Sequence, residues 1–351
     1  MPATRKFGLP LTLAMFCLLA WAAPSAAQQY TLTDLGTLPG NSVSKASALN
    51  DAGEAVGVSD TPTAAIATIF SGGKATNIDT SGSGVSLANA INRAGEIAGW
   101  NSESNTNFDP QAFLYSDGSM KNINSPSLFP SGTEAYGINN SGEVVGTGYL
   151  SPSNFHAFLY TGGKMTDIGP PGSLQASANA VNSSGQIVGS YYLTSGEGGA
   201  FLYSSGKMTT LPVPAGSTAV SALAINDNGE IAGALCPVSG DAAHAASYAN
   251  GAWTDLGAIA GAASNVGMGI NLSGRVVGTA IFPQTQYHPP KPGKHVPFLS
   301  STDGLINLNT LIPTGTGFTL TDAVAINDSG QILCDATNSN GNEHAVLLTL
   351  K

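Results

Sequence analysis

The chain has 351 residues, of which 42% are hydrophobic, only 10% are charged and 44 are glycine. Its formal net charge of −10 makes it a poor electrostatic partner for nucleic acid or for an anionic lipid surface, so we expect neither. Few charged residues and many small polar ones are typical of short strands joined by tight turns. The apolar content argues against disorder.

The first 27 residues have the pattern of a secretory signal peptide. A short basic start precedes an apolar stretch over 7–23, and small residues follow up to Ala27. The apolar stretch is marginal for a membrane span and no second one follows, so we predict no membrane span. We expect an exported protein, secreted or periplasmic, that is cleaved after about Ala27 and whose residues 28–351 form a single domain.

One short sequence motif occurs seven times along the chain: an aliphatic residue, an asparagine, two variable residues and a glycine. Successive asparagines are 42, 47, 43, 44, 45 and 56 residues apart, which indicates a tandem array of one supersecondary unit of about 45 residues. The asparagines are Asn50, Asn92, Asn139, Asn182, Asn226, Asn271 and Asn327. Asparagine in the first place and glycine in the fourth suit a tight turn, so we predict structural turns and not a ring of ligands.

Each unit contains the pattern of four strands. Before the asparagine, small residues alternate with other residues at period two, as in 88–92, and a second strand follows the turn, as in 143–146. The second half of the unit, as in 156–169, has an alternating strand, a glycine turn and another strand. The small residues on the first strand predict that backbones crowd together there.

The two ends of the repeat array complement each other. Residues 344–351 contain the third strand of the seventh unit, and no fourth strand follows it. Residues 30–36 have the pattern of a fourth strand but do not follow a third one. An open array would leave raw strand edges, which proteins avoid. We therefore predict an all-β protein, a seven-bladed β-propeller of four-stranded antiparallel blades whose N-terminal strand completes the last blade. A β-solenoid is the alternative.

Variation in length is confined to two of the four connections in each unit. In an up-and-down sheet these lie on the same face, and functional loops on rigid scaffolds vary in this way. The longest connection covers 284–295, where proline is frequent, and we predict a defined protrusion there. His288 and His295 within it are the better candidates for metal binding or acid/base chemistry.

The third strand of the third unit reads His-Ala-Phe-Leu-Tyr at 156–160, and Thr-Asp-Ile-Gly follows at 166–169. With the phrase Ile-Asn-x-Ser-Gly at 138–142, these residues resemble the bacterial extracellular HAF-repeat family. The resemblance covers essentially all of 28–351. It implies export from a bacterial cell and implies no activity.

Aromatic residues gather after the second strands, on the face with the variable connections. Exposed tyrosine and tryptophan favour recognition of sugars or partner surfaces. The predicted binding residues are Trp100, Tyr149, Tyr191, Tyr192, Tyr287 and His288. We therefore predict a secreted, non-catalytic and monomeric binding module that recognises a glycan, a peptide or a surface partner through this face.

No motif for catalysis, phosphate binding or metal binding is present, so we predict no catalytic residue, no metal and no cofactor. The alternative function is an extracellular polysaccharide-acting hydrolase or lyase that uses carboxylates in the variable loops. The candidate carboxylates are Glu103, Asp109, Glu197, Asp241 and Glu343.

Two further features have structural explanations in the sequence. A polar residue recurs in the fourth strand, and His156, His244 and His344 begin third strands in three of the units. We predict a repeated hydrogen bond within each unit and no shared metal site. Cys236 and Cys334 lie in different units and are expected to be free thiols.

Overall fold

The computed structural model describes residues 30–61, 64–82, 84–102, 109–283 and 293–351. These residues form an all-β structure in which the one helical element is a single 3-10 turn, η1 (Leu308–Thr310). No helix in these ranges is long and apolar enough to cross a membrane. The predicted signal peptide, 1–27, lies outside the described residues.

The strands fall into groups of four, most of them consecutive in the chain. Group 1 comprises β2 (Val43–Leu49), β3 (Ala55–Asp60), β4 (Ala65–Ser71) and β5 (Lys74–Asn77), and group 2 comprises β6 (Val85–Ile91), β7 (Ile97–Ser102), β8 (Gln111–Ser116) and β9 (Ser119–Asn122). Group 3 comprises β10 (Thr133–Ile138), β11 (Val144–Ser151), β12 (Asn154–Thr161) and β13 (Lys164–Asp167). Group 4 comprises β14 (Ser173–Val181), β15 (Ile187–Leu193), β16 (Gly198–Ser204) and β17 (Lys207–Thr210). Group 5 comprises β18 (Ser217–Ile225), β19 (Ile231–Pro237), β20 (His244–Ala249) and β21 (Ala252–Gly257). Group 6 comprises β22 (Ser264–Ile270), β23 (Val276–Ile281), β24 (His295–Ser301) and β25 (Gly304–Asn307). Group 7 comprises β26 (Phe318–Ile326), β27 (Ile332–Asn338), β28 (Glu343–Leu350) and, from the other end of the chain, β1 (Tyr30–Asp34).

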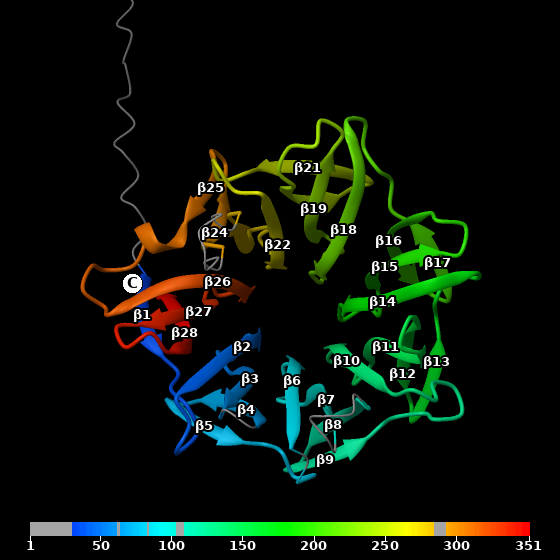
Figure 1. Ribbon diagram of the computed structural model, residues 1–351, viewed down its shortest axis with the longest axis horizontal. Helices are drawn as coiled ribbons and strands as arrows, with labels where there is room; N and C mark the ends of the chain where they lie inside the picture. Colours follow the sequence, from blue (N-terminus) through cyan, green and yellow to red (C-terminus); the bar gives the residue numbers. More distant parts are fainter. Residues whose placement is uncertain (1–29, 62–63, 83, 103–108, 284–292) are drawn as a thin grey trace, which may run out of the picture.

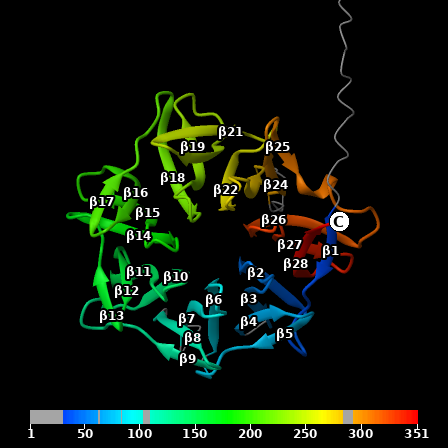
Figure 2. The same ribbon diagram turned by 180° about the vertical axis from the view of Figure 1, so that it is seen from behind.

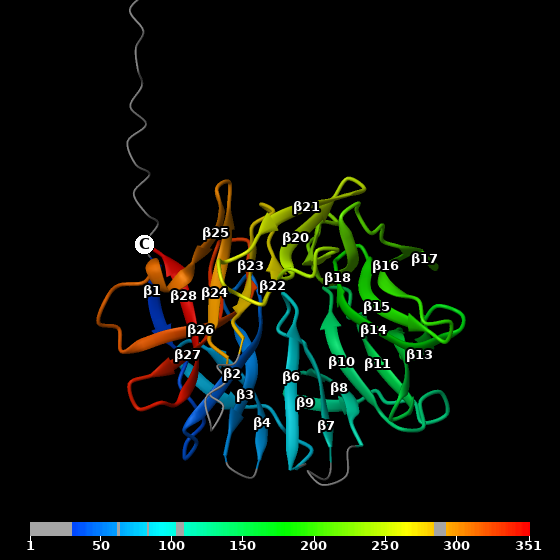
Figure 3. The same cartoon turned by 45° about the horizontal axis from the view of Figure 1, so that its top comes forward.

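Hydrogen bonding joins these groups into five sheets. Three sheets have four strands, and two have eight because a single parallel pairing links groups 1 and 2 and another links groups 3 and 4. The groups surround a common centre, with their first strands innermost and β1 beside β28 (Figures 1 and 2). The arrangement is propeller-like and differs from the linear stack of a β-solenoid. Seen obliquely, neighbouring groups stand side by side around this centre (Figure 3).

The recurring glycine of the second strand is explained by a bulge in the first. In group 1 the register shifts between Ala46 and Ala48, and a Cβ added to Gly57 would lie 1.9 Å from the carbonyl oxygen of Lys45. Groups 2 to 6 repeat this close approach, at 1.8–2.0 Å from the corresponding carbonyl. In group 7 Cys334 replaces the glycine, and there β26 has a further irregularity between Leu320 and Asp322. The predicted crowding of backbones is thus located at these bulges.

The side chain of each turn asparagine is used within its own turn. In group 1, Oδ1 of Asn50 accepts hydrogen bonds from the backbone N–H groups of Ala52 (3.1 Å) and Glu54 (2.9 Å). Gly53 takes the left-handed conformation (φ +80°) and its N–H donates to the carbonyl oxygen of Asn50. Oδ1 makes both contacts in the other groups, except that in group 7 the hydroxyl of Ser329, and not its backbone N–H, donates to Oδ1 of Asn327.

The amide nitrogen of the same asparagine reaches the neighbouring group. Nδ2 of Asn50 donates to the carbonyl oxygen of Asn92, and so on around the centre until Nδ2 of Asn327 donates to the carbonyl oxygen of Asn50. The seven bonds are 2.9–3.2 Å long, and all seven asparagines are buried. We call this set the asparagine ring. The repeat pattern of the sequence did not reveal it.

Hydrophobic clusters fill the spaces between neighbouring groups. In one of them Leu333 and Ala345 of group 7 pack with Ala46 and Ala55 of group 1, so the two ends of the array share a core. Phenylalanine of the third strand is fully buried in several groups, and Phe113 lies across from Gly99, where a side chain would collide with its ring. Burial of apolar surface between groups therefore stabilises the described part of the chain.

Neither thiol in the described residues forms a disulfide, as predicted. Cys334 is buried, and burial raises the pKa of its thiol well above the usual value, which makes it unreactive. Cys236, by contrast, is exposed.

Candidate functional site: an aromatic groove between groups 3 and 4

Three of the aromatic residues predicted to bind a ligand lie close together in the structure. Tyr191 and Tyr192 on β15 line a cavity of about 130 Å³ together with Phe155 on β12. The ring of Tyr149 on β11 lies 5.6 Å from the ring of Phe155. We call the surface formed by Tyr149, Phe155, Tyr191 and Tyr192 the aromatic groove.

Glycines on the neighbouring strand make room for two of these rings. Tyr191 lies across from Gly199 and Tyr192 across from Gly198, and a Cβ on either glycine would lie 3.0–3.2 Å from the tyrosine. Gly199 occupies the position that holds histidine in other units. Because glycine has no side chain there, the hydroxyl of Tyr191 reaches the hydroxyl of Thr210 on β17 at 3.3 Å.

A buried carboxyl group anchors one side of the groove. Glu134 on β10 is 7% exposed and accepts a hydrogen bond from the hydroxyl of Tyr136. Burial raises the pKa of Glu134, while hydrogen bonds with Tyr136 and Tyr149 oppose the rise. Burial and the nearby Glu134 raise the pKa of Tyr149 to about 12.

Polar groups lie beside the aromatic rings. Gln175 and Ser177 on β14 and Ser190 on β15 line the same cavity. The hydroxyl of Ser177 accepts from Thr147 and donates to Oδ1 of Asn179, both at 3.0 Å. The exposed fraction of Tyr192 is 46%, so its ring is available to a ligand, and the amide of Gln175 and the hydroxyl of Ser190 lie beside it.

The other predicted binding residues do not line this groove. Trp100 lies on β7 in group 2, across from Leu87 and Ala112. Tyr287 and His288 lie outside the described residues, as does most of the predicted protrusion and the candidate carboxylate Glu103. His295, at the end of the protrusion, begins β24, and its Nδ1 lies 3.0 Å from Oδ1 of Asp322.

The repeated hydrogen bond predicted from the sequence is present where histidine begins the third strand. Nδ1 of each histidine bonds to the aspartate of the fourth strand at 2.7–3.0 Å. The pairs are His156–Asp167, His244–Asp255 and His344–Asp34. In group 2 Gln111 and Asn122 make the equivalent bond at 2.5 Å. Each pair belongs to a single group, so the pairs form no shared metal site.

Carboxylates also meet where group 7 adjoins group 1. Asp322 and Asp335 are opposite each other on β26 and β27, and Glu343 on β28 forms an ion pair of 3.0 Å with Lys45 on β2. Burial raises the pKa of Asp335 to about 7. The hydrogen bond of 2.8 Å that Oδ1 of Asp335 accepts from the N–H of Ala46 opposes this rise. We call these five residues, with Ala46 contributing its backbone, the seam cluster. The sequence shows the acids but not the strand register that joins them.

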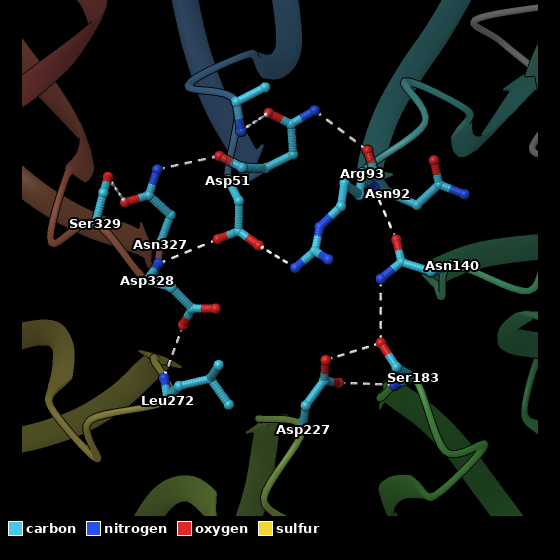
Figure 4. Close-up of polar contacts among 12 residues, drawn as sticks. Asp51, Asn92, Arg93, Asn140, Ser183, Asp227, Leu272, Asn327, Asp328 and Ser329 are labelled. Carbon is cyan, nitrogen blue, oxygen red and sulfur yellow. Dashed lines mark hydrogen bonds and ion pairs between the residues drawn. The ribbon is translucent and has the colours of Figure 1, made fainter.

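A pocket of about 220 Å³ opens at the centre, on the face of the asparagine turns. Figure 4 shows the residues that follow the asparagines, and several bond to their counterpart in the next group. Oδ1 of Asp328 accepts from the backbone N–H of Leu272 at 2.8 Å, and Oδ2 of Asp51 pairs with Arg93 at 2.9 Å. Each asparagine amide beneath already donates to a carbonyl oxygen of the next group, and in six of the seven it also donates to the side chain four positions on.

No group of three or more histidine, cysteine, aspartate or glutamate side chains in the described residues is arranged to hold a metal ion.

No protein-family model matches the chain, and no curated protein does either. Among solved structures, a streptogramin B lyase matches at 13% identity, with a TM-score of 0.51 over 93% of this chain and all of that one. A puromycin-hydrolyzing peptidase of Mycobacterium tuberculosis matches at 11% identity, with a TM-score of 0.55 over 87% of this chain and 50% of that one. This chain thus spans half the length of that peptidase. At these identities the likeness shows the fold alone: the chain has an all-β, propeller-like fold.

Proposed function

We propose that the chain is a closed seven-bladed β-propeller in which β1 completes the last blade. Two observations support this. β1 pairs along its whole length with β28, and the asparagine ring passes from the seventh group back to the first through Asn327 and Asn50. The five sheets are consistent with seven blades, since one parallel residue pair is all that fuses each eight-stranded sheet.

We further propose that the protein is a non-catalytic module that binds saccharides in the aromatic groove. The observation that carries the proposal is the meeting of Phe155, Tyr191 and Tyr192 around one cavity bordered by amide and hydroxyl groups, with the ring of Tyr149 packed against Phe155. A sugar ring has an apolar face that packs on an aromatic ring and hydroxyls that need hydrogen-bond partners. The groove offers both. A peptide or a protein surface is the competing ligand class.

The exposed ring of Tyr192 provides the test. Replacing Tyr192 by Ala should weaken binding of a saccharide identified on a glycan array about tenfold, or about 1.4 kcal/mol, by isothermal titration calorimetry. Tyr192→Phe keeps the ring and should bind within about twofold of the natural protein. Equal affinities for the Ala and Phe variants would reject stacking in the groove.

The proposed cellular setting is extracellular or periplasmic, in line with the leader at 1–27 and the resemblance to the HAF-repeat family. Expression with the leader in a bacterial host should give protein that begins near Gln28 in the periplasm or medium. N-terminal sequencing of the recovered protein checks this. Intact leader on protein that stays in the cytoplasm would contradict it.

One observation favours a second candidate, a polysaccharide-acting hydrolase. In the seam cluster Asp335 has a raised pKa and stands opposite Asp322, and paired carboxyl groups serve as acid and base in glycoside cleavage. Release of reducing ends from polysaccharides, abolished in Asp335→Asn, would support this function. Binding without cleavage by the natural protein would reject it.

A further inference from the structure

A third cavity, of about 350 Å³, lies beside β20 and β21 in group 5. Trp253, His244 and Asp241 line it, as does the segment 214–217 at the start of β18. It shares no lining residue with the aromatic groove. Its volume is at the lower end of the roughly 300–1,000 Å³ of small-molecule pockets.

The histidine in this cavity differs from its two counterparts in the repeat. In the other groups Nε2 is occupied, since Nε2 of His156 bonds to the carbonyl oxygen of Ser173 at 3.1 Å and Nε2 of His344 lies 3.5 Å from Nδ2 of Asn338. For His244 the described residues supply a partner to Nδ1 but none to Nε2. The side chain of His244 is 32% exposed, so this nitrogen is open to a ligand.

Asp255 determines what this free nitrogen can do. Its carboxylate accepts from Nδ1 of His244 at 2.8 Å and from the N–H of Gly257 at 2.7 Å, and both contacts hold it in place. A carboxylate only accepts, so Nδ1 carries a proton, and when the ring is neutral Nε2 presents a lone pair to a ligand. Asp241 adds a second acceptor, with one of its oxygens bonded to the hydroxyl of Ser239 at 2.6 Å. The cavity therefore suits a ligand that donates several hydrogen bonds.

Trp253 supplies an apolar surface. Its indole N–H donates to the carbonyl oxygen of Pro212 at 2.9 Å, so the ring contributes contact area and no free donor. Tyr248 supports it, with ring centroids 5.3 Å apart. An aromatic surface beside hydrogen-bond acceptors fits a ring with an apolar face and several hydroxyl groups.

We propose that this cavity is a second saccharide-binding site, in which Trp253 packs on the sugar ring while His244 and Asp241 accept from its hydroxyls. The ligand class rests on the proposed function of the aromatic groove. The site itself rests on separate residues. A polysaccharide long enough to reach both sites would bind more tightly than its short fragments.

Tryptophan fluorescence isolates this site. The chain has three tryptophans, Trp21, Trp100 and Trp253, and none of them belongs to the aromatic groove. In full-length protein with Trp21→Phe and Trp100→Phe, emission comes from Trp253 alone. Titration with cellohexaose, chitohexaose or xylohexaose should change this emission with at least one of them. His244→Ala in the same background should weaken that response about tenfold, whereas His344→Ala, which removes the equivalent pair in group 7, should leave it unchanged.

The outcomes separate the two proposals. If Trp253 responds and Tyr192→Ala binds as well as the natural protein in calorimetry, the cavity is the saccharide site and the groove is not. If calorimetry detects saccharide binding without any change at Trp253, the cavity proposal is overturned and the groove remains. A response to spermidine but to no saccharide identifies a cation site and overturns the proposed ligand class. Equal loss in His244→Ala and His344→Ala assigns His244 a purely structural role and also overturns the proposal.

Discussion

Each turn asparagine uses both ends of its side-chain amide. Oδ1 accepts from the turn backbone, as at Asn182, while Nδ2 donates to the carbonyl oxygen of the next group. Leaving a buried donor or acceptor unpaired costs more than a surface bond gains, so these residues tolerate little change. The turn could be predicted from Asn and Gly at fixed spacing. The bond to the neighbouring group could not, because it joins residues 42 to 277 positions apart.

The buried carboxyl of Asp335 gives a prediction at the same scale. Its pKa of about 7 in the folded protein exceeds the ordinary value of about 3.9 for an unfolded aspartate, so folding favours its protonated form. This contribution to stability is complete below about pH 4 and is lost as the pH rises through 7. Three pKa units correspond to a loss of about 4 kcal/mol.

Asp335→Asn keeps an oxygen for the N–H of Ala46 and removes the titration. Urea unfolding at pH 5 and pH 8 should show a smaller fall in stability for this variant than for the natural protein. The control is Asp303→Asn, a substitution of an exposed aspartate, which should leave the pH dependence of stability unchanged. An unchanged pH dependence in Asp335→Asn would assign the effect to other members of the seam cluster.

At the scale of elements, strands and turns were predictable and their side-to-side contacts were not. Alternating small residues, fixed turn spacing and the fragments at the two ends indicate four strands per unit and the pairing of β1 with β28, which the structure contains. The aromatic groove illustrates the limit. Tyr149 lies across from Phe155 within group 3, whereas Tyr191 of group 4 comes near Phe155 only because β12 packs beside β14.

The pairing of β1 with β28 predicts how the ends of the chain support each other. Thr33 is exposed and lies opposite Leu347, so Thr33→Pro disturbs the backbone of β1 and little else. We expect a loss of about 2 kcal/mol in urea unfolding. Thr33→Val preserves the strand and should be neutral. Equal stability of the Pro and Val variants would mean that β1 adds little to group 7.

At the scale of the whole molecule, the residues after the asparagines form a second, incomplete ring. The backbone N–H of Arg93, Ser183, Leu272 and Asp328 donates to a side chain of the next group, at 2.8–3.2 Å. Where the corresponding residue of the next group has no side-chain acceptor, this hydrogen bond between groups is missing. Leu272 is such a residue, and 41% of its surface is exposed. It interrupts the ring between Asp227 and its neighbour in group 6.

Leu272→Asn should complete this link by giving the N–H of Asp227 an acceptor, as Asn140 does for Arg93. One added hydrogen bond contributes about 1 kcal/mol, which for a chain of this size raises the melting temperature by about 2 °C. Leu272→Ala removes the same exposed apolar surface without adding an acceptor, so a gain confined to the Asn variant in thermal unfolding identifies the bond. Equal melting temperatures for the two would mean that solvent already satisfies that N–H. A gain would show that stability can be added between groups 5 and 6 without touching the core, because neighbouring groups are joined on this face by short polar links as well as by buried apolar contacts.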